Sequence, residues 1–186
     1  MNGAKLQPEV PNAYEAAFEA WLSERRIAYR PIRQGQRCHS ESPLKRFDYL
    51  LGLDRAQAIL AEVKGRTFGG FSLAGRRGLD GWTTSLDLQA LEQWQKMFAR
   101  HYSPCRAVFV FVFRLKQADV DSDGLEVFWL DGRKYVFFAV EADLYRRCCK
   151  RRSPKWGTMT LSAEDFRRWA VPLEEYLERV WNESGD

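Results

Sequence analysis

The chain has 186 residues, of which 45% are hydrophobic and 29% are charged, an ordinary balance for one globular domain with its own core. The formal net charge of +4 is only mildly basic, so the distribution of charge is more informative than its total. No apolar run approaches the roughly 18 residues of a membrane-spanning helix, and no apolar signal segment opens the chain. We therefore expect a cytoplasmic protein without a membrane partner.

The four cysteines form no metal-binding pattern. The C-x-x-C spacing of zinc sites is absent, and the two histidines add no zinc ligand pattern. We expect free thiols in a reducing compartment at Cys38, Cys105, Cys148 and Cys149.

A first helix is predicted from about residue 13 to 25. Asn12 suits the N-cap position, and Glu15 three residues later completes a capping box. Apolar residues at helical spacing predict a buried face. Glu15 and Glu19 lie one turn apart beside that face, where the simplest roles are a cap for Glu15 and a solvated charge for Glu19.

Residues 27–32, IAYRPI, predict a short strand. Pro31 restricts this strand to a sheet edge, because proline cannot donate a ladder hydrogen bond. A polar loop follows over residues 33–46, and its basic residues are Arg33, Arg37, Lys45 and Arg46.

The stretch from Phe47 to Arg66 predicts two apolar strands separated by a polar turn at Asp54-Arg55. If the strands form an antiparallel hairpin about that turn, the numbers of opposed residues sum to about 110. Asp48 is then expected opposite Ala61 and Glu62.

Three charged side chains should converge at this hairpin. Side chains alternate along a strand, so Glu62 and Lys64 share one face while Val63 points the other way. Burying these charges with Asp48 is unfavourable unless they pair or bind a metal. Two close carboxylates favour a hard cation such as Mg²⁺, which can activate a water beside a phosphate. The alternative is a structural ion pair between Lys64 and one of the two acids.

The chain from Gly65 to Gly81 is rich in glycine and predicts a mobile loop instead of a regular element. Its arginines are Arg66, Arg76 and Arg77. Mobile basic loops suit the phosphates of a nucleic-acid backbone, and the alternative is an ordinary loop made polar by its arginines.

A second helix is predicted from Thr84 or Ser85 to about Arg100, with Gln89 and Gln93 one turn apart beside its apolar stripe. Residues 106–113, RAVFVFVF, predict a central strand that is covered on both faces. Because a helix connects the strands, residues 58–63 and 107–113 are expected to be parallel neighbours.

A β-hairpin is predicted around Asp131-Gly132, which separates two apolar runs, residues 125–130 and 134–140. This hairpin is expected either to extend the sheet or to form a small second one. At the end of the chain, Ser162 and Asp165 predict a capping box, and an acidic helix over residues 163–181 is interrupted at Pro172.

The segment from Leu144 to Trp156 contains six basic residues and no acidic one, with Tyr145 near its start. Such a composition suits nucleic acid, because cations bind phosphates and aromatic rings stack on bases. The alternative is a solvated charged face. The basic residues are Arg146, Arg147, Lys150, Arg151, Arg152 and Lys155.

The predicted order of elements is helix, strand, strand, strand, helix, strand over about residues 12–113. With Asp48 on the second strand and Glu62-Val63-Lys64 on the third, this order resembles the PD-(D/E)xK nuclease superfamily, which includes restriction endonucleases and Holliday junction resolvases. In that resemblance Asp48 stands for the motif aspartate, Glu62 for the second acid and Lys64 for the lysine. Glu15 fits a glutamate that the first helix often adds, and Gln89 or Gln93 fits a glutamine of some members.

The resemblance implies Mg²⁺ or Mn²⁺ bound by Asp48, Glu62, the Val63 carbonyl and, directly or through water, Glu15. Lys64 would stay protonated in the metal-free form and would orient the attacking water or stabilise charge on the phosphate. The sequence departs from the family pattern in that Phe47 replaces the proline, the QxxxY pattern is absent, and the loop after Lys64 is long.

The implied fold is α/β (α+β), with an αβββαβ core over residues 12–113 and a mixed central sheet flanked by helices. Residues 114–186 would form an extension of the same domain, with the hairpin, the basic segment and the acidic helix. The implied function is a metal-dependent nuclease acting on DNA in preference to RNA, with a homodimer expected if both strands are cut. Two alternatives remain open: an inactive nucleic-acid-binding module of a larger complex, and a protein-interaction domain in which Lys64 only forms ion pairs.

Overall fold

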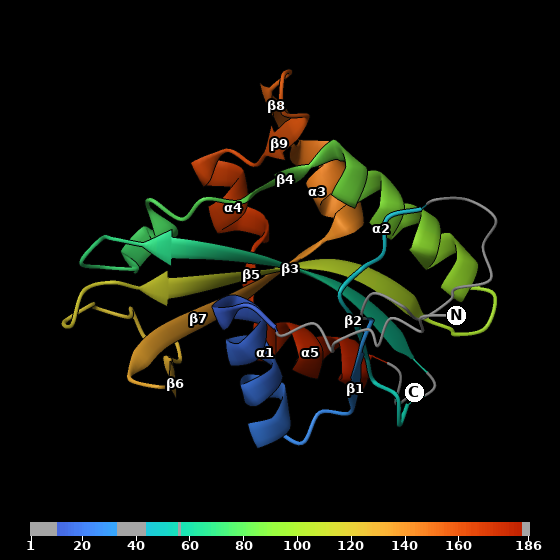
Figure 1. Cartoon of the computed structure of the whole chain (residues 1–186), viewed down its shortest axis with the longest axis horizontal. Helices are drawn as coiled ribbons and strands as arrows, with labels where there is room; N and C mark the ends of the chain where they lie inside the picture. Colours follow the sequence, from blue (N-terminus) through green and yellow to red (C-terminus); the bar gives the residue numbers. More distant parts are fainter. Residues whose placement is uncertain (1–10, 33–43, 56, 184–186) are drawn as a thin grey trace, which may run out of the picture.

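The structure is a computed structural model that describes residues 11–32, 44–55 and 57–183 (Figure 1). Arg33, Arg37 and Cys38 of the predicted polar loop lie outside these residues. The described helices are α1 (Ala13–Glu24), α2 (Ser85–Phe98), α3 (Ala142–Cys148), α4 (Ala163–Trp169) and α5 (Leu173–Asn182), with a short 3-10 helix η1 (Ala74–Arg76). The described strands are β1 (Tyr29–Pro31), β2 (Tyr49–Leu51), β3 (Ala58–Phe68), β4 (Trp82–Thr84), β5 (Cys105–Leu115), β6 (Phe128–Leu130), β7 (Arg133–Glu141), β8 (Lys150–Ser153), β9 (Thr158–Thr160) and β10 (Val171–Pro172).

A mixed seven-stranded sheet divides the molecule, so the predicted α/β (α+β) class is confirmed. Its strand order is β1-β2-β3-β5-β7-β10, and β6 pairs with β7. β3 and β5 are parallel, as predicted from the helix that connects them, while the remaining pairs of this sheet are antiparallel. β7 and β10, which come from the expected C-terminal extension, therefore continue the sheet begun by β1 to β5.

The hairpin at Asp131-Gly132 is confirmed and extends the main sheet. Asp131 and Gly132 have φ values of 48° and 71°, which give the left-handed backbone that suits a two-residue turn between β6 and β7.

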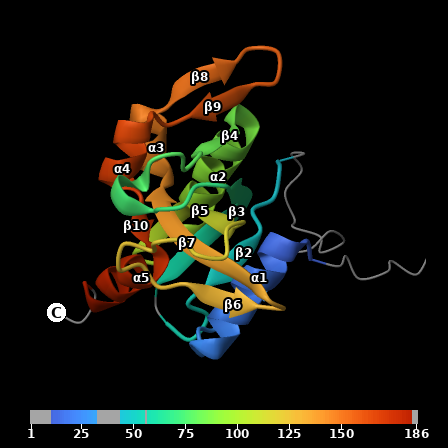
Figure 2. The same cartoon turned by 90° about the vertical axis from the view of Figure 1, so that its left-hand side faces the viewer.

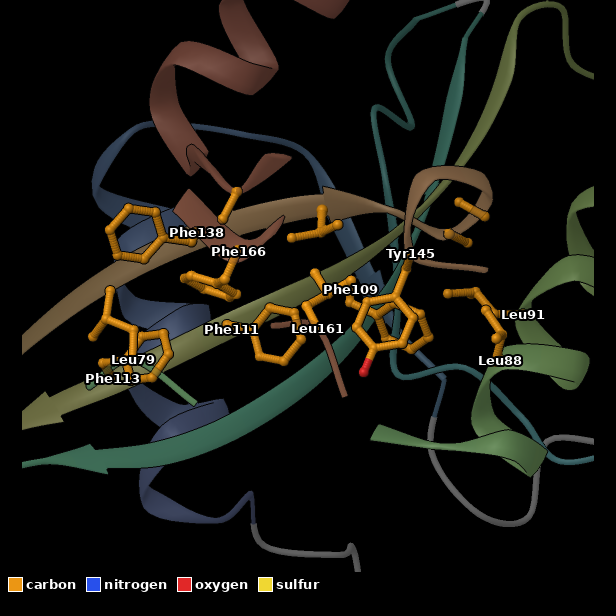
Figure 3. Close-up of a cluster of buried hydrophobic side chains, with 14 of the residues drawn as sticks. Leu79, Leu88, Leu91, Phe109, Phe111, Phe113, Phe138, Tyr145, Leu161 and Phe166 are labelled. Carbon is orange, nitrogen blue, oxygen red and sulfur yellow. The ribbon is translucent and has the colours of Figure 1, made fainter. Parts of the chain in front are cut away.

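Helices cover both faces of the sheet (Figure 1). α1 and α5 pack on one face, and α2, α3 and α4 pack on the other. The strict alternation of β5 explains both layers, because Val108, Val110 and Val112 point toward α1 and α5. Its phenylalanines point the opposite way, into an aromatic cluster with Tyr145 and Phe166 (Figure 3).

A second, three-stranded sheet stands at the edge of the molecule, with the strand order β4-β9-β8 (Figure 2). Sequence analysis did not predict this sheet, because β8 is formed by the basic residues KRRS, which lack apolar alternation. The sheet is tied to the core below it, since the buried Tyr145 donates from its hydroxyl to the carbonyls of Gly81 and Met159 at 2.8 and 2.9 Å.

One predicted element is wrong in its bounds. β3 continues to Phe68, so Gly65 to Phe68 form the end of a strand and not the start of a loop. The reason is the long parallel pairing with β5, which extends to Phe68 opposite Leu115. This pairing provides hydrogen-bond partners for the backbone N–H and C=O groups of the segment, so it stays extended despite its glycine.

The ends of the chain agree with the sequence patterns. Asn12 and Glu15 form the predicted capping box of α1, and the C-terminal helix is interrupted at Pro172, where β10 separates α4 from α5. Cys105, Cys148 and Cys149 are free thiols. None of the helices in the described ranges combines the length and the apolar character needed to cross a lipid bilayer.

Candidate active site

The register of β2 and β3 fixes Asp48. Tyr49 lies opposite Ala61, so the predicted sum of about 110 is confirmed. The ladder continues by one residue, because the Asp48 amide donates to the Ala61 carbonyl at 3.1 Å. Beyond this point the Val63 amide of β3 donates to a side chain instead of a backbone carbonyl, because Asp48 Oδ2 accepts its hydrogen bond at 2.8 Å. The carboxylate of Asp48 is therefore held beside β3, next to Glu62.

Glu62 and Lys64 share one face of β3, as predicted. Lys64 Nζ donates to Glu62 Oε1 at 2.8 Å, while Val63 packs on the opposite face, in the cluster of α1 and α5. The face of Glu62 and Lys64 is the one covered by α2, where Leu60 of β3 and Leu50 of β2 also pack. Because alternation along β2 puts Asp48 on the side of Leu50, all three charged side chains belong to the same face.

A fourth charged residue, Asp87, completes the arrangement from α2. Its side chain is only 2% exposed, and its Oδ2 accepts from Lys64 Nζ at 2.7 Å. Asp87 occupies the third position of α2, where it also forms a capping box with Thr84. Sequence analysis missed this residue, although the pattern Thr84-x-x-Asp87 is a capping-box signal that orients an acid at the start of the helix.

Lys45 is the second residue that sequence analysis left without a role. Its Nζ lies 3.4 Å from Glu62 Oε1 and donates to Asp87 Oδ1. The backbone before β2 is held against α2, because Trp94 Nε1 donates to the Lys45 carbonyl at 2.8 Å. Two ammonium groups thus bind two nearly buried carboxylates, and Lys45, with its side chain 51% exposed, is the more accessible of the two lysines.

The electrostatics differ between the acid and the base of this site. The pKa of Asp48 is raised from 3.8 to about 7, mainly by burial and then by the negative charge of Glu62. The hydrogen bond from Val63 and the charge of Lys64 oppose this rise only in part. Burial lowers the pKa of Lys64, and the contact with Glu62 only partly offsets this. The direction of this shift does not contradict the expected protonation of Lys64 in the metal-free form, which stays a prediction.

The site offers two close carboxylates for a small, hard cation but no third side-chain ligand among the described residues. Asp48 and Glu62 place like charges close enough to disturb each other, which a divalent cation between them would relieve. Among the described residues, however, no group of three or more Asp, Glu, His or Cys side chains is arranged to hold a metal ion. Mg²⁺ is commonly bound by one or two carboxylates and completes its shell with water and phosphate, so two acids remain compatible with it.

Glu15 and Glu19 both lie on α1. Glu15 Oε2 accepts from the Asn12 amide at 3.1 Å, so Glu15 has the predicted capping role. Its charge also contributes to the raised pKa of Asp48, which places it within electrostatic range of the site. Glu19 is not simply a solvated charge, because its Oε1 accepts from the Tyr49 hydroxyl at 2.9 Å.

The predicted phosphate-binding arginines have different surroundings. Arg66 donates to the carbonyls of Gly65 and Trp82, and its guanidinium lies 3.8 Å from the centre of the Trp82 ring. Arg76 donates to the carbonyls at the end of α4. Both arginines therefore hold backbone in place, whereas Arg77 is exposed. Gln89 and Gln93 are exposed on α2.

The basic segment is divided between two elements. Arg146 and Arg147 lie on α3, whereas Lys150, Arg151 and Arg152 lie on β8. Acidic partners come from other elements, because Arg146 pairs with Glu92 at 2.7 Å and Arg152 with Asp80 at 3.1 Å. The expectation of a run without counter-charges is wrong for Arg146 and Arg152, because their partners are distant in sequence.

The two aromatic residues of the basic segment are placed differently. Tyr145 is fully buried and cannot stack on a base, while Trp156 is 71% exposed. Lys155 is exposed beside Trp156.

No protein-family model matches the chain, and no curated protein matches it in sequence.

Proposed function

We propose that this protein is a Mg²⁺- or Mn²⁺-dependent nuclease that hydrolyses phosphodiester bonds in DNA and belongs to the PD-(D/E)xK superfamily. The observation that carries the proposal is the strand register that brings Asp48 beside Glu62, with Lys64 on the same face. The order α1, β1, β2, β3, α2, β5, with η1 and β4 inserted before α2, and the parallel pairing of β3 with β5 support the assignment to that superfamily.

Asp48 and Glu62 would hold the cation, with the Val63 carbonyl and Glu15 as further candidate ligands. When bound, such a cation polarises a phosphate oxygen and lowers the pKa of a water molecule. Lys64 supplies a positive charge next to this position, suited to orienting an attacking water or to stabilising the negative charge that develops on the phosphate.

Asp87 is a positioning residue in this proposal. It holds Lys64 through a 2.7 Å hydrogen bond and is itself fixed by the Thr83 hydroxyl and the Thr84 amide at 3.0 and 3.2 Å. Because the Lys64 side chain is long and flexible, a second buried acceptor reduces the number of positions that its ammonium group can adopt.

The test is a cleavage assay with linear, branched and single-stranded DNA and with RNA, each in Mg²⁺, Mn²⁺ and EDTA. The variants are Asp48→Asn and Lys64→Met, and the matched controls are Asp54→Asn and Lys96→Met, which change exposed residues of the same types. We expect metal-dependent cutting by the parent and both controls, and a loss of at least about a hundredfold in the two site variants. Absence of cutting on every substrate, or site variants as active as the parent, would contradict the proposal.

A second candidate function is supported by the charge balance of the site. Lys45 and Lys64 together neutralise Glu62 and Asp87, as expected of a structural network in a nucleic-acid-binding module without activity. That module would bind DNA in a salt-sensitive manner without metal, and Asp48→Asn would leave its affinity unchanged. DNA binding that requires Mg²⁺ and is lost on adding EDTA would exclude it. The described structure contains one chain, so the expected homodimer stays a prediction.

A further inference from the structure

The turn between β8 and β9 carries the most exposed tryptophan of the described residues. β8 and β9 pair as an antiparallel ribbon that projects from the body of the molecule (Figure 2). Trp156 lies in the connecting turn with 71% of its surface exposed. Lys155 Nζ lies 5.3 Å from the centre of its ring, and Lys150 and Arg151 are exposed along the ribbon. Within the described part of the chain, no carboxylate lies within ion-pair distance of these three cations.

The ribbon is anchored to the start of α2. Thr158 of β9 pairs with Thr84 of β4, and the Ser85 amide donates to the Gly157 carbonyl at 2.8 Å. Gly157 has a φ of 56°, and a Cβ added there would lie 3.3 Å from Ser85 Oγ, so the turn packs closely on the helix. The buried hydroxyl of Tyr145 donates to the carbonyl of Met159, the middle residue of β9. The exposed turn is therefore a fixed feature of the fold.

The same helix start connects the ribbon to the candidate active site. Thr84 caps α2 and donates its amide to Asp87, whose carboxylate binds Lys64. The consecutive residues Thr84 and Ser85 therefore connect the two places, because Ser85 binds the turn of Trp156 and Thr84 binds Asp87 of the charged site. A polymer bound at that site would have its neighbouring units close to the ribbon.

The chemistry of the turn fits one kind of polymer segment. An exposed indole next to cations suits a base stacked on the ring and phosphates bound by the cations. A paired and stacked base inside a duplex does not offer its face to a side chain, whereas an unpaired base does. We propose that the β8–β9 ribbon is a DNA-binding arm in which Trp156 stacks on an unpaired base next to the phosphate at the candidate active site. This inference rests on the proposed function and adds that the substrate contains a single-stranded segment.

A matched control is present in the same chain. Trp129 on β6 is 59% exposed, and Lys134 Nζ lies 4.8 Å from the centre of its ring. Among the described strands, β6 pairs only with β7 in the main sheet and is not part of the sheet that joins the ribbon to α2. Trp129 thus reproduces the local chemistry of Trp156 at a different place.

The experiment measures binding of the full chain to fluorescein-labelled DNA by fluorescence anisotropy, in EDTA and in Ca²⁺. The probes are a single strand, the fully paired duplex, and RNA with the sequence of the single strand. We expect Trp156→Ala to weaken binding of single-stranded DNA at least about fivefold, with most of the affinity kept in Trp156→Phe. We expect Trp129→Ala to change the affinity for single-stranded DNA less than about twofold. The affinity for duplex DNA should also change less than about twofold in Trp156→Ala.

Three outcomes would overturn the inference: equal binding of single-stranded DNA by Trp156→Ala and the parent, an equal loss in Trp129→Ala, or a clear preference of the parent for RNA. Circular dichroism of each variant shows that binding is compared between folded proteins. The nuclease assignment is tested separately by cleavage. Binding that depends on Trp156 without any cleavage would reject the nuclease and keep the arm. Metal-dependent cleavage by the parent, with unchanged DNA binding by Trp156→Ala, would support the nuclease and reject the arm.

Discussion

At Asp48, burial and the nearby charge of Glu62 raise the pKa to about 7, while the carboxylate accepts a hydrogen bond from the Val63 amide. The folded pKa is above the ordinary value of 3.8, so the folded protein binds more protons than the unfolded chain between about pH 4 and pH 7. The free energy of unfolding of the metal-free protein therefore falls as the pH rises through this range. Asp48 therefore lowers the stability of the protein around neutral pH, and a binding or catalytic role would explain why such a residue is present.

The variant Asp48→Asn tests this interpretation. Asparagine can still accept the Val63 hydrogen bond but carries no charge, so in EDTA at pH 8 we expect a free energy of unfolding about 1–4 kcal/mol higher than that of the parent. The difference should vanish below about pH 4, where the carboxyl group is protonated in both states. Urea unfolding across this pH range measures it, with Asp54→Asn as the exposed control. A variant less stable than the parent at pH 8 would show that Asp48 stabilises the fold.

Asp87 has the opposite role, because it stabilises two lysines from a buried position. Asp87→Asn keeps the amide acceptor for the helix cap but removes the charge that Lys45 and Lys64 bind. We expect a loss of roughly 2–3 kcal/mol in the free energy of unfolding at pH 7, since an unpaired buried charge is unfavourable. Asp165→Asn is the control, because Asp165 also follows its helix cap by three residues and has no lysine partner in the described part of the chain. Equal losses in the two variants would assign the effect to capping alone.

At the scale of elements, the packing of α1 on β3 brings Glu15 toward the site. Gly65 makes this contact possible, since a Cβ at this position would lie 2.3 Å from the Tyr14 ring. The Tyr14 hydroxyl also lies 2.9 Å from Thr67 Oγ1, further along β3. The first turn of α1 is therefore fixed by two contacts to the strand that carries Glu62 and Lys64.

Gly65→Ala is expected to lower the free energy of unfolding by about 1–3 kcal/mol, because the methyl group must displace the Tyr14 ring and with it the start of α1. Gly69→Ala is the matched control, since nothing lies within 4 Å of a Cβ at that position. Thermal unfolding of the two variants provides the comparison. If Gly65→Ala is as stable as Gly69→Ala, α1 is not held by this close approach.

The elements that sequence analysis predicted well have strong local signals. The capping box at Asn12, the turn at Asp131-Gly132 and the apolar run of β5 are each determined by neighbouring residues, and each is confirmed. The strands of the second sheet lack such signals. β4 and β9 are short, and β8 is basic. Contacts that are distant in sequence stabilise them, namely the pairing of β4 with β9 and the hydrogen bond from Tyr145 to β9.

The part of the candidate site that lies on the β2–β3 hairpin was predictable from the sequence. Asp48, Glu62 and Lys64 follow from the turn position and from alternation along the strands, and these two features are local. Asp87 and Lys45 required the packing of α2 on β3 and on the chain before β2, which no local pattern specifies. The partners of the basic segment were missed for the same reason, because Glu92 and Asp80 are distant in sequence.

At the scale of the whole molecule, the central sheet separates the layer of α1 and α5 from the layer of α2, α3 and α4, which carries the charged site and the ribbon (Figure 1). Substrate contacts should therefore concentrate on the side of α2, β4 and the β8–β9 ribbon. The proposed activity requires that Asp48 and Glu62 together bind a divalent cation.

The most direct measurement of that claim is a Mn²⁺ titration of the metal-free protein, in which electron paramagnetic resonance reports the concentration of the free ion. The control variant is Asp54→Asn, and the site variants are Asp48→Asn and Glu62→Gln. We predict bound Mn²⁺ in the parent and the control, and strongly reduced binding in both site variants, because each loses one of the two carboxylate ligands. Equal Mn²⁺ binding by the parent and the Glu62→Gln variant, or none by the parent at millimolar Mn²⁺, would contradict the claim.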